Sequence, residues 1–154
     1  MHLPDANIRS SSYLIAETQA RCAHCGRASR VLAVGLPPNH ETLDEGEWQQ
    51  VDANALIFNI ASLPDAIARQ LLERSPGFHQ TGGADPAESH WVNHCPYCAG
   101  AFSDDELHCE PGGFMPGSTL EAQVISLTKV ERSFSAAAGG YALEPEFFAS
   151  MRRR

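Results

Sequence analysis

Two Cys-x-x-Cys units are the residues of this chain whose types and spacing best suit chemistry, Cys22-Ala23-His24-Cys25 and Cys95-Pro96-Tyr97-Cys98. The two-residue gap allows a tight turn to aim both sulfurs of a unit at one metal ion, while N–H groups of the turn donate to the sulfurs. Two such units supply the four thiolates of a closed, tetrahedral structural zinc site. The predicted ligands of one Zn²⁺ ion are Cys22, Cys25, Cys95 and Cys98.

The second unit has a different meaning when it is taken alone, because Cys-Pro-Tyr-Cys is also the redox tetrapeptide of glutaredoxins. A redox unit of that class needs a buried strand before it and a helix after it, whose N-terminus lowers the thiol pKa. Residues 90–94 are a poor candidate for a buried strand, and Gly100 follows the unit closely. This reading also leaves the first unit unexplained, so the shared zinc site is favoured.

The fifth cysteine, Cys109, raises the hypothesis of an enzyme with a site around His94, His108, Cys109 and Glu110. A lone cysteine is more commonly a small, partly buried side chain than a nucleophile. The histidines could in principle form a second metal site together with His90, but roles beside the zinc site or on the surface are favoured. The residues form no complete catalytic constellation, so we predict no catalytic residue, and the enzyme hypothesis stays an alternative.

The elements that must position the cysteines follow from the neighbouring patterns. Residues 11–20 and 30–36 are rich in β-branched and apolar side chains, which predicts one strand entering the first unit and one leaving it. Residues 55–60 predict a buried strand, and residues 119–131 predict another from their partial alternation. Polar or glycine-rich composition predicts loops at 37–50, 79–89, 110–118 and 133–142.

One main helix is predicted over residues 63–74, with Ser62 as its N-cap. Leu63, Ile67 and Leu71 fall on one stripe of this helix, as expected of a helix packed on a sheet. A short last helix is predicted over 145–151, because proline is favoured at the first helical position.

These elements predict an α+β fold in which a split zinc ribbon lies on a small antiparallel sheet with one main helix. The chain, 1–154, is predicted to be a single domain. Because 69 residues separate Cys25 from Cys95, far more than in a compact zinc ribbon, the ribbon must be formed by 11–35 and 89–115. Residues 36–88 are then an inserted, helix-containing segment.

The charge of the chain restricts its partners. The formal net charge is −8, and four thiolates with one Zn²⁺ would make it about −10. This charge opposes general binding to nucleic acid or anionic membranes. A local basic face from Arg21, Arg27, Arg30 and the arginine tail keeps a nucleic-acid role as a lesser alternative. An acidic inhibitor or immunity-type partner of a basic protein is a further alternative.

The compartment is predicted from three features of the sequence. The N-terminus lacks the basic start and apolar run of a signal peptide, and no stretch approaches the ~20 apolar residues of a membrane span. The odd number of cysteines argues against a disulfide framework. We therefore expect a soluble, cytoplasmic protein without membrane contact; the sequence predicts no oligomeric state.

The two cysteine units and the segment after them resemble a group of uncharacterised bacterial zinc-ribbon-like proteins. Those proteins carry an early Cys-x-x-Cys and, later, a pattern like N-x-C-P-x-C-G followed by L-H-x-E-P-G-G. The matching positions here are Asn93, Cys95, Pro96, Cys98, Leu107, His108, Glu110, Pro111, Gly112 and Gly113. Ala99 departs from the expected glycine. The resemblance implies four cysteine ligands and no reaction, so we predict a non-catalytic adaptor or regulatory protein with a protein partner.

Overall fold

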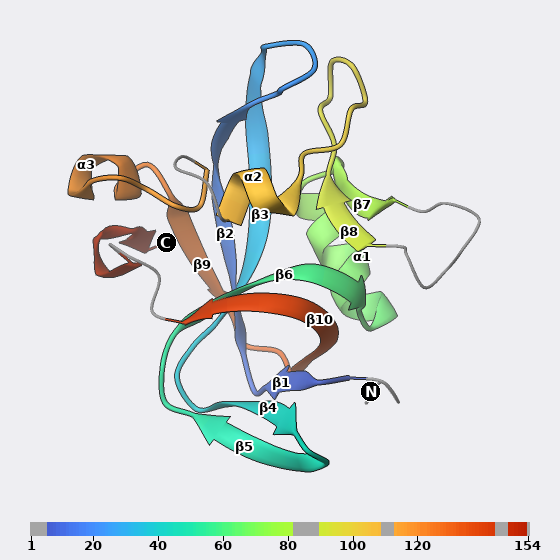
Figure 1. Ribbon diagram of the computed structural model, residues 1–154, viewed down its shortest axis with the longest axis vertical. Helices are drawn as coiled ribbons and strands as arrows, with labels where there is room; N and C mark the ends of the chain where they lie inside the picture. The colour runs from blue at the N-terminus through green and yellow to red at the C-terminus, as the bar shows by residue number, and fades with distance from the viewer. Residues whose placement is uncertain (1–5, 82–89, 109–112, 144–147, 154) are drawn as a thin grey trace.

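A long antiparallel hairpin, formed by β2 (Tyr13–Arg21) and β3 (Ala28–Leu36), runs through the centre of the computed structural model (Figure 1). The structure describes residues 6–81, 90–108, 113–143 and 148–153. The turn of the hairpin carries the first cysteine unit, which confirms the predicted order of strand, cysteine turn and strand. The described residues form a mostly-sheet small domain with one main helix, compatible with the predicted α+β class.

The other strands extend the hairpin into one sheet with the order β11-β9-β2-β3-β6-β10-β1-β4-β5, to which β8 is added by pairing with β6 and β7. Only Ser11 and Ser12 separate β1 from β2. The order of paired strands from β2 through β3, β6 and β10 therefore ends at β1, the strand that directly precedes β2 in the sequence. In Figure 1, β6 and β10 cross the hairpin. The bounds of these strands are β1 (Ile8–Ser10), β4 (His40–Asp44), β5 (Glu47–Val51), β6 (Ala55–Ser62), β7 (Phe78–Thr81), β8 (His90–Asn93), β9 (Ser126–Val130), β10 (Phe134–Leu143) and β11 (Arg152–Arg153).

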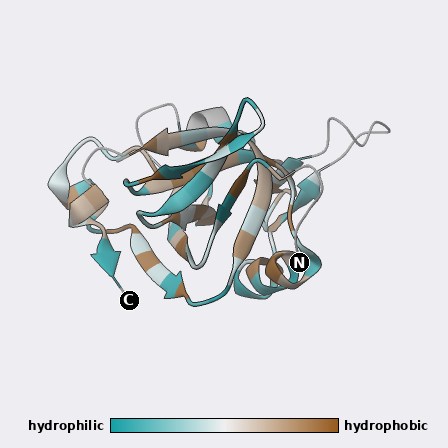
Figure 2. Ribbon diagram, turned by 90° about the horizontal axis from the view of Figure 1, so that it is seen from below, coloured by the Kyte–Doolittle hydropathy of each residue, from teal (hydrophilic) through white to brown (hydrophobic). Residues whose placement is uncertain are grey.

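Two hydrophobic clusters lie on opposite faces of the hairpin, because successive side chains of a strand point to opposite sides. Apolar and hydrophilic segments alternate along several strands in Figure 2. Tyr13 and Ile15 join the cluster that packs on the main helix, whereas Leu14 and Ala16 join the other. The second cluster includes two of the cysteines, Cys22 and Cys95. The hairpin is thus buried on both faces near its base and carries the cysteine turn at its far end.

The main helix is α1 (Asp65–Arg74), whose buried residues Ile67 and Leu71 lie on the predicted stripe. The predicted N-cap is wrong: Ser62 ends β6, and Pro64 occupies the N-cap position without a side-chain cap. The other helical elements are the short α2 (Asp104–His108), α3 (Thr119–Ala122) and the 3-10 helix η2 (Phe148–Ser150). Among the described residues, no helix is long and apolar enough to span a membrane.

Arg74 fixes the end of α1 to the sheet. Its guanidinium donates to the carboxylate of Glu17 on β2 at 2.9 Å and to the hydroxyl of Thr128 on β9 at 2.9 Å. The Glu17 side chain is only 7% exposed and also contacts Arg30 at 3.4 Å. A buried carboxylate is tolerated when its lone pairs are satisfied in this way, so the network holds the helix, β2, β3 and β9 in one arrangement.

Several predicted elements differ from the structure, among them the loop predicted at 79–89, whose residues 79–81 belong to the strand β7. Residues 37–50, predicted as a loop, contain β4 and most of β5, and residues 133–142, also predicted as a loop, are the long strand β10. Residues 119–131 were predicted as one strand, but Thr119–Ala122 is helical and only Ser126–Val130 is a strand. Of the last predicted helix, residues 148–150 are a 3-10 helix, and residues 145–147 lie outside the described residues.

Asn93, the last residue of β8, joins the second cysteine segment to the central hairpin. Its Nδ2 donates to the carbonyl of Leu32 at 2.9 Å, and its Oδ1 accepts from the N–H of Leu32 at 2.8 Å. The residue is 2% exposed. Its own carbonyl also accepts from the N–H of Phe102, beyond the cysteine turn. One side chain therefore sets the position of the second segment against β3.

Replacement of Asn93 should be strongly destabilising. Asn93→Ala leaves a buried N–H and a buried C=O of Leu32 without partners, which should lower the free energy of unfolding by about 3 kcal/mol. Asn7→Ala is the matched control, because Asn7 makes the same two hydrogen bonds to the backbone of Ala138 from an exposed position. Water replaces those bonds, so the control should cost under about 1 kcal/mol. Equal losses in urea unfolding would contradict the role given to Asn93.

Candidate metal centre

The two Cys-x-x-Cys units form turns with the same backbone geometry, here called the first knuckle (residues 22–27) and the second knuckle (residues 95–100). In each, the N–H of the first cysteine donates to a carbonyl five residues later, from Arg27 and from Gly100. In each, the N–H of the residue after the second cysteine donates back to the carbonyl of the first cysteine. A β-pair closes each knuckle, Arg21 with Ala28 and His94 with Ala101.

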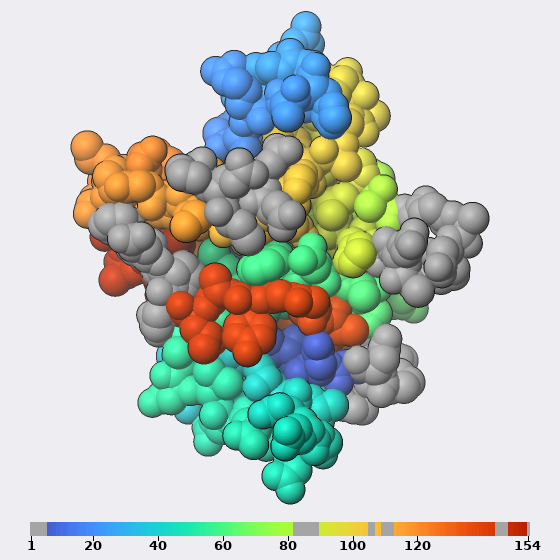
Figure 3. Space-filling view, in the orientation of Figure 1, coloured from blue at the N-terminus to red at the C-terminus, as the bar shows by residue number. Residues whose placement is uncertain are grey.

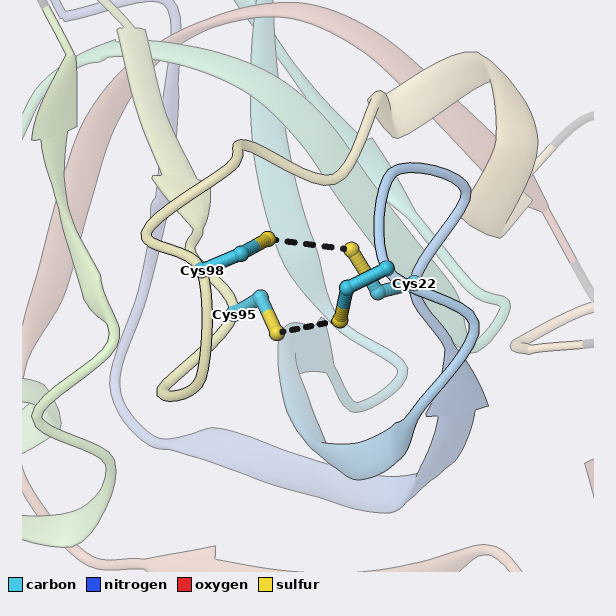
Figure 4. A group of neighbouring side chains, drawn as sticks. Cys22, Cys95 and Cys98 are labelled. Atoms are coloured by element: carbon cyan, nitrogen blue, oxygen red, sulfur yellow. Dashed lines mark hydrogen bonds between the residues drawn. The ribbon is translucent and has the colours of Figure 1, made fainter.

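The four sulfurs meet where the knuckles face each other. The Sγ atoms of the four cysteines all lie within 4.8 Å of one another. Two sulfur–sulfur contacts join the different knuckles, Cys22 to Cys98 at 3.6 Å and Cys25 to Cys95 at 3.6 Å, and are drawn as dashed lines in Figure 4. The structure therefore brings together all four predicted ligands, from segments far apart in the sequence, and this cluster could hold a metal ion.

Local N–H groups and the protein core position the sulfurs. The N–H of His24 donates to the sulfur of Cys22, and the N–H of Gly100 donates to that of Cys98, both at 3.4 Å. Cys22 and Cys95 are 2% exposed and pack in the core cluster, whereas Cys25 and Cys98 are exposed. The cluster thus lies at the boundary between the core and solvent, with one buried and one exposed sulfur from each knuckle.

The two thiols of the second knuckle have pKa values shifted in opposite directions by their surroundings. Burial acts to raise the pKa of Cys95, but the N–H groups of Cys98 and Tyr97, with neighbouring thiols, lower it to about 7. At Cys98 the N–H of Gly100 acts to lower the pKa, but burial and the three neighbouring thiols raise it to about 11. Four adjacent thiols cannot all ionise unless a positive charge lies among them.

A left-handed residue follows the second cysteine of each knuckle. Gly26 has φ +77°, as expected for a glycine at this position, and Ala99 has φ +63°. Ala99 therefore keeps the turn geometry in spite of its Cβ atom, which makes this conformation unfavourable for residues other than glycine. Alanine in place of glycine at position 99 therefore costs stability but does not change the shape of the turn.

The residues of the alternative enzyme site have other contacts in the structure. The imidazole of His94 stacks on that of His79, with ring centroids 3.7 Å apart, and its Nδ1–H donates to the carbonyl of Gly77. The imidazole of His108 lies between the rings of Phe58 and Phe114, with centroid distances of 4.9 and 5.3 Å. The other two residues of that hypothesis, Cys109 and Glu110, lie outside the described residues.

Within the part of the chain that the structure describes, the four cysteines are the one group of three or more Cys, His, Asp or Glu side chains placed to hold a metal ion. The suggested second metal site at the histidines does not form among these residues. The chain matches no protein-family model, no curated protein and no solved structure. The geometry of the cysteine cluster therefore carries the functional argument.

The strain at Ala99 leads to a stability prediction. Ala99→Gly should raise the free energy of unfolding by about 1 kcal/mol, because glycine adopts positive φ without a steric cost. The matched reverse change is Gly26→Ala, which should lower it by about 1 kcal/mol. A Cβ atom on Gly26 would have no heavy atom within 4 Å, so its effect reports conformation alone. Denaturation of the metal-loaded protein checks both; effects of the same sign would contradict this account.

His108 should make the fold sensitive to acid. Burial lowers its pKa from 6.5 to about 4, so below pH 6.5 the unfolded chain binds a proton that the folded chain does not bind until about pH 4. Stability is therefore lost as the pH falls through this window, by about 3 kcal/mol. His108→Phe keeps the ring stack and should remove this part of the loss. Unfolding free energies at pH 7 and pH 4.5 check it, and equal pH dependence in both proteins would contradict it.

Proposed function

We propose that this chain is a zinc-binding protein whose single Zn²⁺ ion is structural and is held by Cys22, Cys25, Cys95 and Cys98. The observation that carries the proposal is the convergence of four sulfurs, all within 4.8 Å, from two knuckles with matching backbone hydrogen bonds. Packing of the protein core alone could also bring four sulfurs together. The repeated turn geometry, with N–H groups aimed at sulfur, is what a thiolate ligand requires.

The donor set favours zinc among the common metals. Four thiolates at tetrahedral corners select Zn²⁺ or an iron–sulfur centre, because harder cations prefer oxygen. Sulfurs 2.3 Å from a tetrahedral zinc ion lie about 3.8 Å apart, close to the cross-knuckle distances of 3.6 Å. Four cysteine ligands also fill the coordination shell and leave no open position for a substrate. The metal would therefore stabilise the fold rather than take part in a reaction.

The zinc would join two distant parts of one domain. In this proposal residues 11–35 and 89–115 form a split zinc ribbon, residues 36–88 are an insertion, and the whole chain is one domain. The pairing of each knuckle's flanking residues supports a ribbon geometry. Membership of the bacterial zinc-ribbon-like group belongs to the same proposal, and Asn93 supports it, since this motif residue has a structural role at the ribbon.

The biological role that we propose is that of an adaptor or regulatory protein with a protein partner. The support is chemical: a closed thiolate shell gives a rigid surface without giving a reactive centre. Because thiolate ligands must stay reduced, we place the protein in the cytoplasm. A protein partner is favoured over nucleic acid, because the net charge of −8 repels the phosphate backbone.

Metal analysis of the purified protein tests the proposal. We expect one zinc ion per chain, and Cys22→Ser or Cys95→Ser should lose it together with most of the stability, because structural zinc contributes about 10 kcal/mol or more to folding. Zinc release should increase as the pH falls, since protons compete for the thiolates. Protein purified without zinc, in a fold that added zinc does not stabilise, would contradict the proposal.

Cys109→Ser is the control for this experiment. The proposal excludes Cys109 from the ligand set, so this variant should keep its zinc and its stability. Zinc loss from Cys109→Ser equal to that from Cys95→Ser would show that the ligand set is wrong, even if the protein binds zinc.

A further inference from the structure

The outer surface of the two knuckles carries an exposed group of basic and aromatic side chains. We call it the knuckle face and define it by Arg21, His24, Arg27 and Tyr97, all of which are exposed. Tyr97 has 57% of its surface exposed. In Figure 3 the two knuckles lie side by side at one end of the molecule, opposite the β4–β5 hairpin. The knuckle face is thus at the tip of the fold, open to a partner.

The side chains of the knuckle face are held in place before any partner arrives. The guanidinium of Arg27, from the first knuckle, lies over the ring of Tyr97, from the second, 4.9 Å from its centroid. The ring of His24 lies against Gly100, where a Cβ atom would approach it to 2.5 Å. Arg21 donates to the carbonyl of Gly26. Because these contacts restrict the side chains, binding would cost less conformational entropy.

The knuckle face carries basic side chains and no acidic ones, although the four thiolates with one Zn²⁺ in the same knuckles would add a charge of about −2. None of the nineteen acidic residues lies within residues 20–30 or 91–102. Arg21 and Arg27 form no ion pair with a carboxylate of the described residues, whereas Arg9, Arg30 and Arg74 each do. Two exposed guanidinium groups without an ion pair among the described residues therefore lie on the knuckles, in a protein whose net charge is −8.

We propose that the knuckle face binds a short acidic segment of a partner protein, with Arg21 and Arg27 on its carboxylates and Tyr97 as the apolar contact. Arginine and tyrosine are enriched among residues that dominate binding energy, and arginine clusters recognise acidic motifs. A short segment meets only the tip, whereas a nucleic-acid strand would extend along the acidic body. The inference rests on the proposed function, because the metal would hold the two knuckles together.

Binding of a labelled polyglutamate peptide of about ten residues, followed by fluorescence anisotropy, tests the proposal on the full-length protein. We expect binding that weakens with salt. Arg27→Ala should weaken it about fivefold or more, the effect of one dominant side chain. Tyr97→Ala should also weaken it, because it removes the ring under the guanidinium. Arg69→Ala, which removes the same charge from the exposed side of α1, should have little effect.

Zinc content, measured on the same samples, separates this proposal from the one on which it rests. Zinc-free wild-type protein refutes the metal site, whereas weaker peptide binding at full zinc content supports the knuckle face. Four results would overturn the inference, and the first three are no peptide binding at ~20 mM salt, tighter binding of a single-stranded oligonucleotide, and zinc loss from Arg27→Ala. The third result would mean that the arginine offsets the thiolate charge and does not serve a partner. Self-association that Arg27→Ala abolishes would identify a second copy as the occupant and would also overturn it.

Discussion

The cysteine cluster depends on one constraint: two short segments separated by 69 residues must meet so accurately that four sulfurs lie within 4.8 Å of one another. A metal ion cannot impose that accuracy on its own, because the loop between the segments would have to be ordered at the same time. The buried amide of Asn93 on the backbone of Leu32 supplies a second fixed point just before the second knuckle. Pairing of Trp91 with Ile60 fixes the same segment to the sheet. These contacts of the fold therefore help to position both knuckles, and a bound metal would add to them.

The rest of the architecture keeps the central hairpin rigid enough to carry the first knuckle. One face of β2 and β3 packs on α1, and the carboxylate of Glu17 accepts from Arg74 at the end of that helix. The other face packs on the cluster that contains Cys22, Cys95 and the ring of Phe102. Changes in either core would alter the position of the knuckles, so distant mutations could affect metal binding through packing alone.

The elements of the fold that could be predicted from the sequence are those marked by a pattern of neighbouring residues. The strands around the first unit and the apolar stripe of α1 are local patterns, and both were predicted. The β4–β5 hairpin was missed because its turn, with Glu45 at φ +50° and Gly46 at φ +81°, joins strands of mostly polar residues. β10 was missed because glycine looks like loop, although a Cβ on Gly140 would overlap the Phe58 ring. The start of α3 did have a readable signal, Ser118 capping the N–H of Glu121.

The two knuckles differ in sequence but have the same backbone geometry. Both have the same hydrogen bonds and the same left-handed residue, yet one uses glycine and the other alanine. A strained residue persists only where its surroundings impose its conformation. The surroundings of Ala99 are the second knuckle itself: the pair of His94 with Ala101 and the N–H of Cys95 on Gly100 close the turn around it. Turn closure, more than the identity of the residue at the left-handed position, therefore determines the shape in which each knuckle holds its two sulfurs.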